Sequence, residues 1–436
     1  MLVFILDASD PADVRATAAS LEELAGEWRP MYIRDHYAAT MNRALAAYGQ
    51  PFFVVLFAGD ALLPELAAEL PDMCSRLPEN CAGIVFREPA EREGLPPLLR
   101  PAAPAVWRTA AVVGGARPSF PGREQLPFEQ YAPHDKMYRL SGEWRWQELP
   151  DPRWHPCRRR ARRWSRDAQT WQLIHPIIRG EDDSAPSAGR PAVSIVVCCY
   201  NDADYLPWAV RSVRAQTDSS WELIIIDDGS IDEPESKLRP FADDPRIRLI
   251  RFEANRGKAF RLNEALALAQ GEWLLELDAD DGPPPNCVAP LLPAARREAE
   301  PPAVVYADTC EWSETTAGTL RYQGVRRSPN PFLPERLLSE AFPVAPRMYR
   351  TDALRSIGGW LTDDPFDGRL YEDFQILLRM SRRFPLRHEA GPLYHVRIRR
   401  SSVIHRHAGQ YDRWRHWAEG LLLDAGTDDD RPPQKG

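Results

Sequence analysis

Three carboxylates follow an apolar run in the segment GEWLLELDADDGPPP, which spans residues 271–285. The run predicts a buried strand, and Gly282 with the three prolines after it prevents the strand from continuing. The strand therefore ends at Asp278, Asp280 and Asp281, and carboxylates this close together repel one another unless a cation lies among them. Hard divalent cations prefer such oxygen ligands, so the segment predicts a metal site. The alternative is a solvated acidic turn, and the surrounding segments decide between the two.

The elements that would position these acids are short strands that end in polar residues. Residues 193–197 run into the sequence CCYN, and residues 223–226 run into DDGS. Residues 247–251 are followed by NRGK, and Asp204 is a candidate N-cap for the first helix between these strands. Apolar residues at helical spacing between the strands predict parallel pairing, which brings the polar ends to one carboxyl edge. Open α/β folds bind ligands at this edge.

Phosphate groups would have to be neutralised without a glycine-rich loop. The sequence contains neither a G-x-G-x-x-G motif nor a P-loop motif. A divalent cation held by the acids can take over this role, because it acts as a Lewis acid toward phosphoryl oxygens.

Composition indicates a globular protein with more than one domain. The chain has 436 residues, 44% of them hydrophobic, and a formal net charge of −8 that argues against nucleic-acid binding. No apolar run approaches the roughly 20 residues needed to cross a bilayer. The start, MLVFILDASD, reads as a strand rather than a signal peptide. Seven cysteines without C-x-x-C spacing predict buried or free thiols in a reducing, cytoplasmic compartment.

The first half has a βαβ pattern of its own and echoes the second half. Residues 2–6 and 52–57 read as strands and residues 37–48 as a helix. Without gaps, residues 42–64 pair with residues 263–285, beginning NRALA against NEALA. Weaker echoes, in the same order, pair WRT with YRT and the segment from Tyr131 with the segment from Tyr371. Together they predict a duplicated domain. The alternative is chance similarity between two unrelated βαβ units.

The acids are lost in this first copy. Phe57 stands opposite Asp278 and Gly59 opposite Asp280, while Ala132-Pro133 stands opposite Glu372-Asp373. A phenylalanine would expel a hydrated cation, and the remaining carboxylate makes a poor divalent site. We therefore expect residues 1–143 to form a degenerate domain that does no chemistry.

The remaining boundaries follow from composition. Residues 144–191 form an Arg/Trp-rich connector and linker, residues 192–420 a catalytic domain, and residues 421–436 a polar tail. The stretch 153–164, with its run RRRARRW, has two interpretations. It lies on an anionic membrane surface at the inner face, or it is a solvated arginine face whose tryptophans pack on a domain.

The ordered motifs of residues 192–402 resemble family 2 glycosyltransferases with the GT-A fold. They are SIVVCCYN, WELIIIDDGS, NRGK, LDADD, GGW and YEDFQILLR. The resemblance implies an inverting enzyme that transfers a sugar from a nucleotide-sugar donor to an acceptor hydroxyl on a carbohydrate or lipid-linked molecule. It further implies a role in cell-surface polysaccharide or glycoconjugate assembly. No Q-x-x-R-W follows Asp373, and Cys198 stands where Thr or Ser is commoner, so processive synthesis is not implied.

The resemblance also implies roles for individual residues. Asp280 would ligate Mn²⁺ or Mg²⁺, and Asp278 would contact the ribose or the metal. Asp373, in the segment YEDFQILLR, would be the general base. The alternative for Glu372 and Asp373 is a helix first turn, where negative charge is favoured.

Other residues are assigned to the donor. Tyr200 would stack on the nucleobase and Asp228 would hydrogen-bond it. Arg399 lies in a segment similar to one that closes over the diphosphate in the family, and Lys258 is assigned to donor binding. The alternatives are a core aromatic for Tyr200, a turn residue for Asp228, and surface positions for the two cations. Two rival functions are a sugar-phosphate nucleotidyltransferase, which would need a glycine-rich basic loop after the first strand, and a non-catalytic scaffold.

Overall fold

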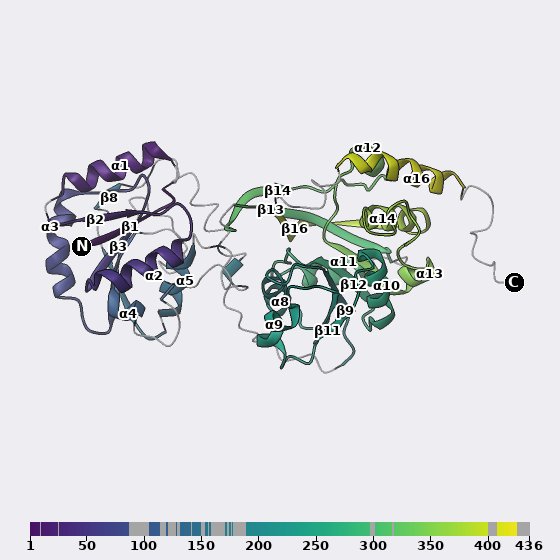
Figure 1. Ribbon diagram of the computed structural model, residues 1–436, viewed down its shortest axis with the longest axis horizontal. Helices are drawn as coiled ribbons and strands as arrows, with labels where there is room; N and C mark the ends of the chain where they lie inside the picture. Colours follow the sequence, from purple (N-terminus) through teal and green to yellow (C-terminus); the bar gives the residue numbers. More distant parts are fainter. Residues whose placement is uncertain are drawn as a thin grey trace. The chain divides into compact units, whose positions relative to one another are not determined.

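In the computed structural model the chain divides into two compact units (Figure 1). The first consists of residues 1–178 with 314–321, and the second of residues 179–313 with 322–436. The structure describes residues 1–424 except 9, 25, 87–103, 114–118, 121–127, 129–130, 141, 150–152, 156, 158–170, 172–173, 176, 178–188, 297–300, 316–317 and 400–407.

The described part of the first unit holds a mixed sheet of six strands in the order β2-β1-β3-β6-β5-β7, and β4 pairs separately with β8. The strands are β1 (Leu2–Leu6), β2 (Arg29–Tyr32), β3 (Phe52–Phe57), β4 (Ala61–Leu62), β5 (Cys81–Phe86), β6 (Ala105–Arg108), β7 (Arg145–Leu149) and β8 (Trp154–His155). The helices are α1 (Pro11–Glu22), α2 (Tyr37–Tyr48), α3 (Pro64–Ser75), α4 (Thr109–Val113) and α5 (Ala132–Leu140).

The described part of the second unit holds a sheet of eight strands in the order β11-β10-β9-β12-β15-β13-β14, with β16 paired to β13. The strands are β9 (Val193–Cys199), β10 (Trp221–Asp227), β11 (Ile247–Arg251), β12 (Trp273–Asp278), β13 (Val304–Glu314), β14 (Leu320–Arg326), β15 (Arg347–Arg350) and β16 (Leu386–Ile398). The helices are α8 (Leu206–Arg214), α9 (Pro234–Leu238), α10 (Lys258–Leu268), α11 (Val288–Arg296), α12 (Pro334–Glu340), α13 (Thr351–Ser356), α14 (Glu372–Arg383) and α16 (Tyr411–Asp424).

Helices cover both faces of each sheet, so the central strands are buried on both sides. In β1, Phe4 packs in the core that includes α2, α4 and α5, whereas its neighbour Ile5 packs with α1 and α3. In β9, Val196 packs with α10, α13 and α14, whereas Val197 packs with α8 and α11. This alternation follows from the two-residue period of a strand and explains the continuous apolar runs in the sequence.

Local sequence signals predict several of these elements, mainly the central strands of both sheets and the helices between them. Several strands and the helix α2 begin and end where the periodicity places them. The prediction that Asp204 caps α8 is wrong, because the helix begins at Leu206 and Tyr205 is its N-cap. Asp204 instead forms an ion pair with Lys237 of α9, with 2.7 Å between Oδ1 and Nζ. All seven cysteines lie within the described residues and are free thiols, as predicted.

The first unit extends further along the chain than the predicted boundary at residue 143. β7 pairs in parallel with β5, and β8 pairs with β4, so both belong to the first unit rather than to a connector. Trp154 and Trp171 are buried, as the packing alternative predicts. The arginine run 158–164, the linker residues 181–188 and the tail from residue 425 lie outside the described residues. No helix in the described ranges is long and apolar enough to span a membrane.

The two sheets share strand order and register, although their sequences differ. The order β2-β1-β3-β6-β5-β7 corresponds to β10-β9-β12-β15-β13-β16, and every neighbouring pair keeps its parallel or antiparallel sense. Phe53 pairs with Trp107 as Leu274 pairs with Tyr349, which are the partners that the sequence echo aligns. Phe57 and Asp278 end the equivalent strands β3 and β12. β11 and β14 of the second unit have no equivalent strand in the described part of the first unit.

One pair of hydrogen bonds recurs in both units. The Asn42 side chain accepts from the backbone N–H of Phe120 (2.9 Å) and donates to its carbonyl oxygen (3.0 Å). The Asn263 side chain makes the same two bonds with Trp360, at 2.9 and 2.8 Å. Each asparagine lies on the helix that precedes the central strand, and each fastens a loop that precedes α5 or α14.

We expect these two asparagines to be equally important for stability. Asn42→Ala and Asn263→Ala each leave a backbone N–H and a carbonyl without their partner, which should lower the free energy of unfolding by about 1–3 kcal/mol. Urea denaturation followed by tryptophan fluorescence measures the loss. Asn80 is exposed, and its alanine variant, as the control, should change stability by less than about 0.5 kcal/mol. Losses no larger than that of the control would show that the bonds do not hold the loops.

Candidate active site

The predicted acids of the second unit gather at one edge of its sheet. Asp278 is the last residue of β12, and Asp280 and Asp281 follow in the turn after it. Glu372 and Asp373 open α14, where the helix dipole favours negative charge. Tertiary structure thus brings together acids that lie about a hundred residues apart in the sequence, and it does so at the carboxyl end of the central strand.

Lys258 connects these acids and is not a surface residue, so that alternative is wrong. Its ammonium group lies 2.5 Å from Asp278 Oδ1, 2.9 Å from Glu276 Oε1 and 3.0 Å from Glu372 Oε1. The three carboxylates raise the pKa of Lys258 well above its usual value, although burial opposes them. The lysine is therefore charged and holds the end of β12 to the start of α14.

A second cation, Arg347 of β15, lies behind the lysine. Its guanidinium bonds Glu276, with 3.1 Å from Nε to Oε2 and 2.8 Å from Nη2 to Oε1. The Tyr349 hydroxyl donates to Glu276 Oε2 at 3.2 Å. Burial alone would raise the pKa of Glu276, but Arg347 and Lys258 lower it to about 2. We call Lys258, Glu276, Arg347 and Tyr349 the buried charge network.

Asp373 lies at the border of this network. Its Oδ2 is 3.6 Å from Arg347 Nη1, and about a fifth of its side chain is exposed. Burial raises the pKa of Asp373, whereas Arg347 and Lys258 oppose the rise. Glu372 is more deeply buried, and burial together with the neighbouring Asp373 and Glu276 carboxylates raises its pKa to about 7 against the influence of Lys258. Each of the two acids has a cation of the network beside it, and Asp373 is the more exposed to solvent.

Asp280 is paired with the predicted diphosphate residue Arg399. Its Oδ2 lies 2.6 Å from Arg399 Nε, and Arg399 Nη1 lies 2.7 Å from Asp202 Oδ1. Burial, with the Asp278 and Asp202 carboxylates, raises the pKa of Asp280 to about 6 despite Arg399. Arg399 therefore closes over the acids after β12 rather than lying at the surface.

The acids at this edge offer carboxylate oxygens, which are suitable ligands for a hard divalent cation. Among the described residues, no group of three or more His, Cys, Asp or Glu side chains is arranged as a metal site. The carboxylates of Asp278 and Asp202 nevertheless lie close enough to Asp280 to contribute, after burial, to its raised pKa. Carboxylate oxygens with such an excess of negative charge are the ligands that Mg²⁺ and Mn²⁺ prefer. Asp280 and Asp278 are the residues that would hold the cation.

Asp228 accepts hydrogen bonds that hold a neighbouring loop, in addition to its predicted role at the nucleobase. Its carboxylate accepts from the backbone N–H groups of Arg256 and Gly257, at 2.9 and 2.8 Å, and from Arg261 Nε at 2.5 Å. These bonds fix the loop that leads into Lys258. The turn alternative placed its bonds within its own loop, whereas the partners lie 28 residues or more along the chain.

Tyr200 lies at the same edge, just after β9, and 48% of its surface is exposed. A core role for Tyr200 is therefore wrong, and its ring is open to a ligand. Asn201, the next residue, has a left-handed backbone with φ of 57° and accepts from the Ile231 N–H. The loop after β9 is thereby fastened to the loop after β10.

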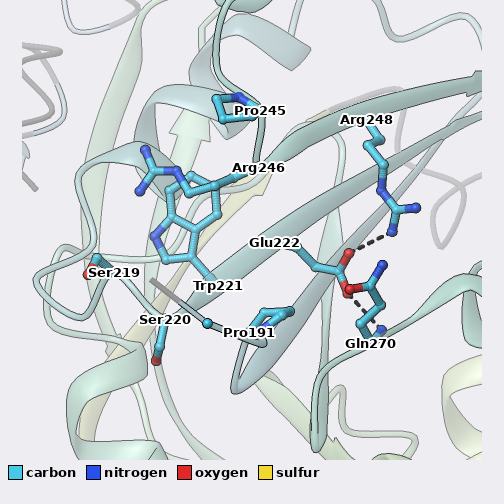
Figure 2. A pocket seen from close by; sticks show the side chains of 10 residues that line it. Pro191, Ser219, Ser220, Trp221, Glu222, Pro245, Arg246, Arg248 and Gln270 are labelled. Carbon is cyan, nitrogen blue, oxygen red and sulfur yellow. Dashed lines mark hydrogen bonds and ion pairs between the residues drawn. The ribbon is translucent and has the colours of Figure 1, made fainter. Parts of the chain in front are cut away.

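A pocket of about 230 Å³ lies at the opposite, amino edge of the sheet. Figure 2 shows Glu222 facing Arg248 and Gln270, with Arg246 beside Trp221. Glu222 accepts from Arg248 at 2.6 Å and from the Gln270 N–H at 2.7 Å, and the Arg246 guanidinium stacks 3.9 Å above the Trp221 ring. The pocket is far along the strands from the acids, and its charges bond one another, so it is not the candidate site.

Sequence reasoning missed four members of the site, namely Glu276, Arg347 and Tyr349, and also Asp202, which pairs with Arg399. Glu276 interrupts the apolar strand β12, and a carboxylate inside a buried strand is a signal that a partner exists. Arg347 and Tyr349 had no such signal, because they lie 71 and 73 residues beyond Glu276 in an ordinary short strand.

The family resemblance is confirmed for the second unit. Residues 194–358 match the family model described as glycosyl transferase family 2. The second unit therefore contains a region similar to family 2 glycosyltransferases, on a mixed α/β sheet.

Individual relatives match shorter stretches of this domain. The succinoglycan biosynthesis protein ExoO of Rhizobium meliloti strain 1021 is 34% identical over 105 residues, which is 24% of this chain and 30% of that protein. The UDP-Glc:alpha-D-GlcNAc-diphosphoundecaprenol beta-1,3-glucosyltransferase WfgD of Escherichia coli is 38% identical over 89 residues, 20% of this chain and 35% of that protein. The chain thus spans about a third of the length of these relatives.

A solved structure shows a distant likeness. The mannosyltransferase PcManGT from Pyrobaculum calidifontis, in complex with GDP-Man and Mn²⁺, is 21% identical with a TM-score of 0.39. The likeness covers 62% of this chain and 75% of that one.

Proposed function

We propose that this protein is an inverting, metal-dependent glycosyltransferase that moves a sugar from a nucleotide-sugar to an acceptor hydroxyl. One observation carries the proposal, namely the convergence of two separate acid pairs at the carboxyl edge of β12. Asp278 and Asp280 form the pair suited to a cation, and Glu372 and Asp373 form the pair suited to a base. Both pairs lie at the edge where α/β sheets bind ligands, in a unit that contains a region similar to family 2 glycosyltransferases.

The chemistry follows from the position of these groups. A divalent cation held by Asp280 and Asp278 would offset charge on the leaving nucleoside diphosphate as a Lewis acid. Asp373 accepts the proton of the acceptor hydroxyl while the hydroxyl oxygen attacks the anomeric carbon. The attack comes from the face opposite the leaving diphosphate, so one displacement inverts the anomeric centre. Tyr200, with its exposed ring, stacks on the nucleobase.

The acceptor is a growing carbohydrate or a lipid-linked sugar in the assembly of a cell-surface polysaccharide. The relatives' names support this class, since one takes part in succinoglycan biosynthesis and another uses a diphosphoundecaprenol-linked acceptor.

We further infer that the first unit binds no donor. Phe57 and Gly59 occupy the positions of Asp278 and Asp280, and Phe57 is packed in the core with Tyr37 and Trp107. A Cβ added at Gly59 would lie 2.6 Å from both Cβ and Sγ of Cys157, so no acid fits there without a rearrangement. The one carboxylate kept at this edge, Asp60, is buried and accepts from the backbone N–H groups of Phe57 and Cys157, and a single carboxylate is a poor site for a divalent cation.

The test is metal-dependent release of nucleoside diphosphate from a panel of nucleotide-sugars. The panel is first screened by thermal shift with Mn²⁺, because a donor at 100 times its Kd adds roughly 2.7 kcal/mol of stability. We expect one nucleotide-sugar to stabilise the protein, to bind with one site per chain, and to be hydrolysed or transferred only with metal. A protein that neither binds nor turns over any donor would contradict the transferase, and two donor sites per chain would contradict the inert first unit.

A further inference from the structure

The first unit provides an internal comparison for the buried charge network. The two sheets keep the same register, so each network position has a structural counterpart. Glu276 faces Arg347 across β12 and β15, and Val55 faces Ala105 across β3 and β6. Lys258 opens α10, and Tyr37 opens α2. For Glu276, Arg347, Tyr349 and Lys258 the counterparts are, in the same order, Val55, Ala105, Trp107 and Tyr37.

These counterparts show that the fold does not require the charges. Val55, Ala105, Trp107 and Tyr37 are all buried in one core cluster of the first unit, and the strands pair there as they do in the second. Buried ion pairs are generally no more stabilising than well-packed apolar residues of similar volume. A glutamate with 1% of its side chain exposed and an arginine with 5% exposed are therefore retained in the second unit for another reason.

That reason lies in what the network touches. Lys258 bonds Asp278 and Glu372, and Arg347 reaches Asp373, so the network links the end of β12 to the first turn of α14. In the first unit the linked acids are absent together with the network, since Phe57, Ala132 and Pro133 stand in their places. The network and the acids therefore occur together or not at all.

We propose that Glu276, Arg347, Tyr349 and Lys258 are positioning residues, which fix Asp373 relative to Asp278 and hence the base relative to the donor. The proposal rests on the proposed transferase function. Glu276 anchors the two cations, Arg347 holds the base ionised and in place, and Lys258 ties Asp278 to α14. A base displaced by about 1 Å can cost roughly 10²-fold in rate, because the reacting atoms must lie in near-attack geometry.

The test replaces three residues of the network with their apolar counterparts from the first unit. The triple variant Glu276→Val/Arg347→Ala/Tyr349→Trp removes one negative and one positive charge and leaves Lys258 with Asp278 and Glu372. We expect the variant to fold and to bind the donor within about 3-fold of wild type, while kcat falls by about 10²-fold or more. Arg248→Met is the control, because Arg248 belongs to the pocket at the amino edge (Figure 2), and its kcat should be unchanged.

Two single variants keep the test decisive if the triple variant fails to fold. Arg347→Met removes a cation that lowers the pKa of Asp373, so the acid limb of the kcat profile should move to higher pH, and Arg347→Lys should move it back. The charged and titratable groups around Asp373 are Arg347 and Tyr349 of β15, Lys258 of α10, Glu276 and Asp278 of β12, Glu372 of α14, Tyr371 before it and Tyr411 of α16.

The outcomes separate the two proposals. Wild-type kcat and an unmoved acid limb in folded Arg347→Met would overturn the positioning role, whether or not the triple variant folds. Loss of kcat with donor affinity retained and rescue by lysine would support it. If the wild-type protein releases no nucleoside diphosphate from any donor, the transferase function fails first, and the positioning role falls with it.

Discussion

Replacement of Asp373 by asparagine is expected to lower turnover by about 10²- to 10⁴-fold, because an amide cannot accept the proton of the acceptor hydroxyl. Donor affinity should change little, since Asp373 opens α14 whereas the groups assigned to the metal and diphosphate follow β12 and β16. Steady-state kinetics with saturating acceptor, together with calorimetric donor binding, measures the two effects separately.

The pH dependence of wild-type turnover gives a second measurement of the role of Asp373. The base must be ionised, and burial raises the pKa of Asp373 above its usual value. Turnover should therefore fall as the pH is lowered, and the fall should begin at a higher pH than an ordinary aspartate would give. Asp352→Asn is a matched control, because Asp352 also lies in a helix first turn but is 79% exposed. If Glu372→Gln abolished turnover while Asp373→Asn did not, the base would be Glu372.

Replacement of Asp280 by alanine is expected to abolish the contribution of the metal to donor binding. A Lewis-acid contact is worth several kcal/mol, which corresponds to about 10²-fold or more in Kd. The measurement is donor Kd with and without Mn²⁺, since wild type should gain affinity from the metal and Asp280→Ala should gain none.

This design also accounts for Arg399, which loses one of its two carboxylate partners in the variant and keeps Asp202. Arg399 could then bind the diphosphate more strongly without metal, so only the difference between the two conditions reports on Asp280. Asp243→Ala, at an exposed position, is the control and should keep the full metal effect. A metal effect of wild-type size in Asp280→Ala would assign the cation to other ligands. Any residual site in the first unit would also appear as metal-dependent binding in this variant.

Much of the fold could be predicted from the chain because its signals are local. A buried parallel strand reads as a short apolar run and an amphipathic helix as a 3.6-residue period, so β1, α2 and β3 were located correctly. The internal repeat added information on longer range, since residues 42–64 and 263–285 pair without gaps. It predicts that Phe57 and Asp278 lie at equivalent strand ends, and these residues end β3 and β12.

The acids at the sheet edge were also predictable, and their partners were not. Asp278, Asp280 and Asp373 stand at strand or helix ends, where local sequence and topology determine the edge that they reach. Whether Lys258 lies at the surface or among three carboxylates depends on β12 and α14, which lie up to 114 residues away in the chain.

The sequence alone therefore indicated the central strands of both sheets, the acids that follow them, and which copy keeps its acids. Only the tertiary structure decided which charges meet, because cross-strand register sets the neighbours of a buried side chain and no local pattern reports it. Glu276 bonds Arg347, which lies 71 residues further along the chain. Asp228 accepts hydrogen bonds from the loop before Lys258, from residues at least 28 positions away. In a buried, low-dielectric environment these contacts between charged side chains determine which carboxylates are ionised, and hence which of them can act as the base.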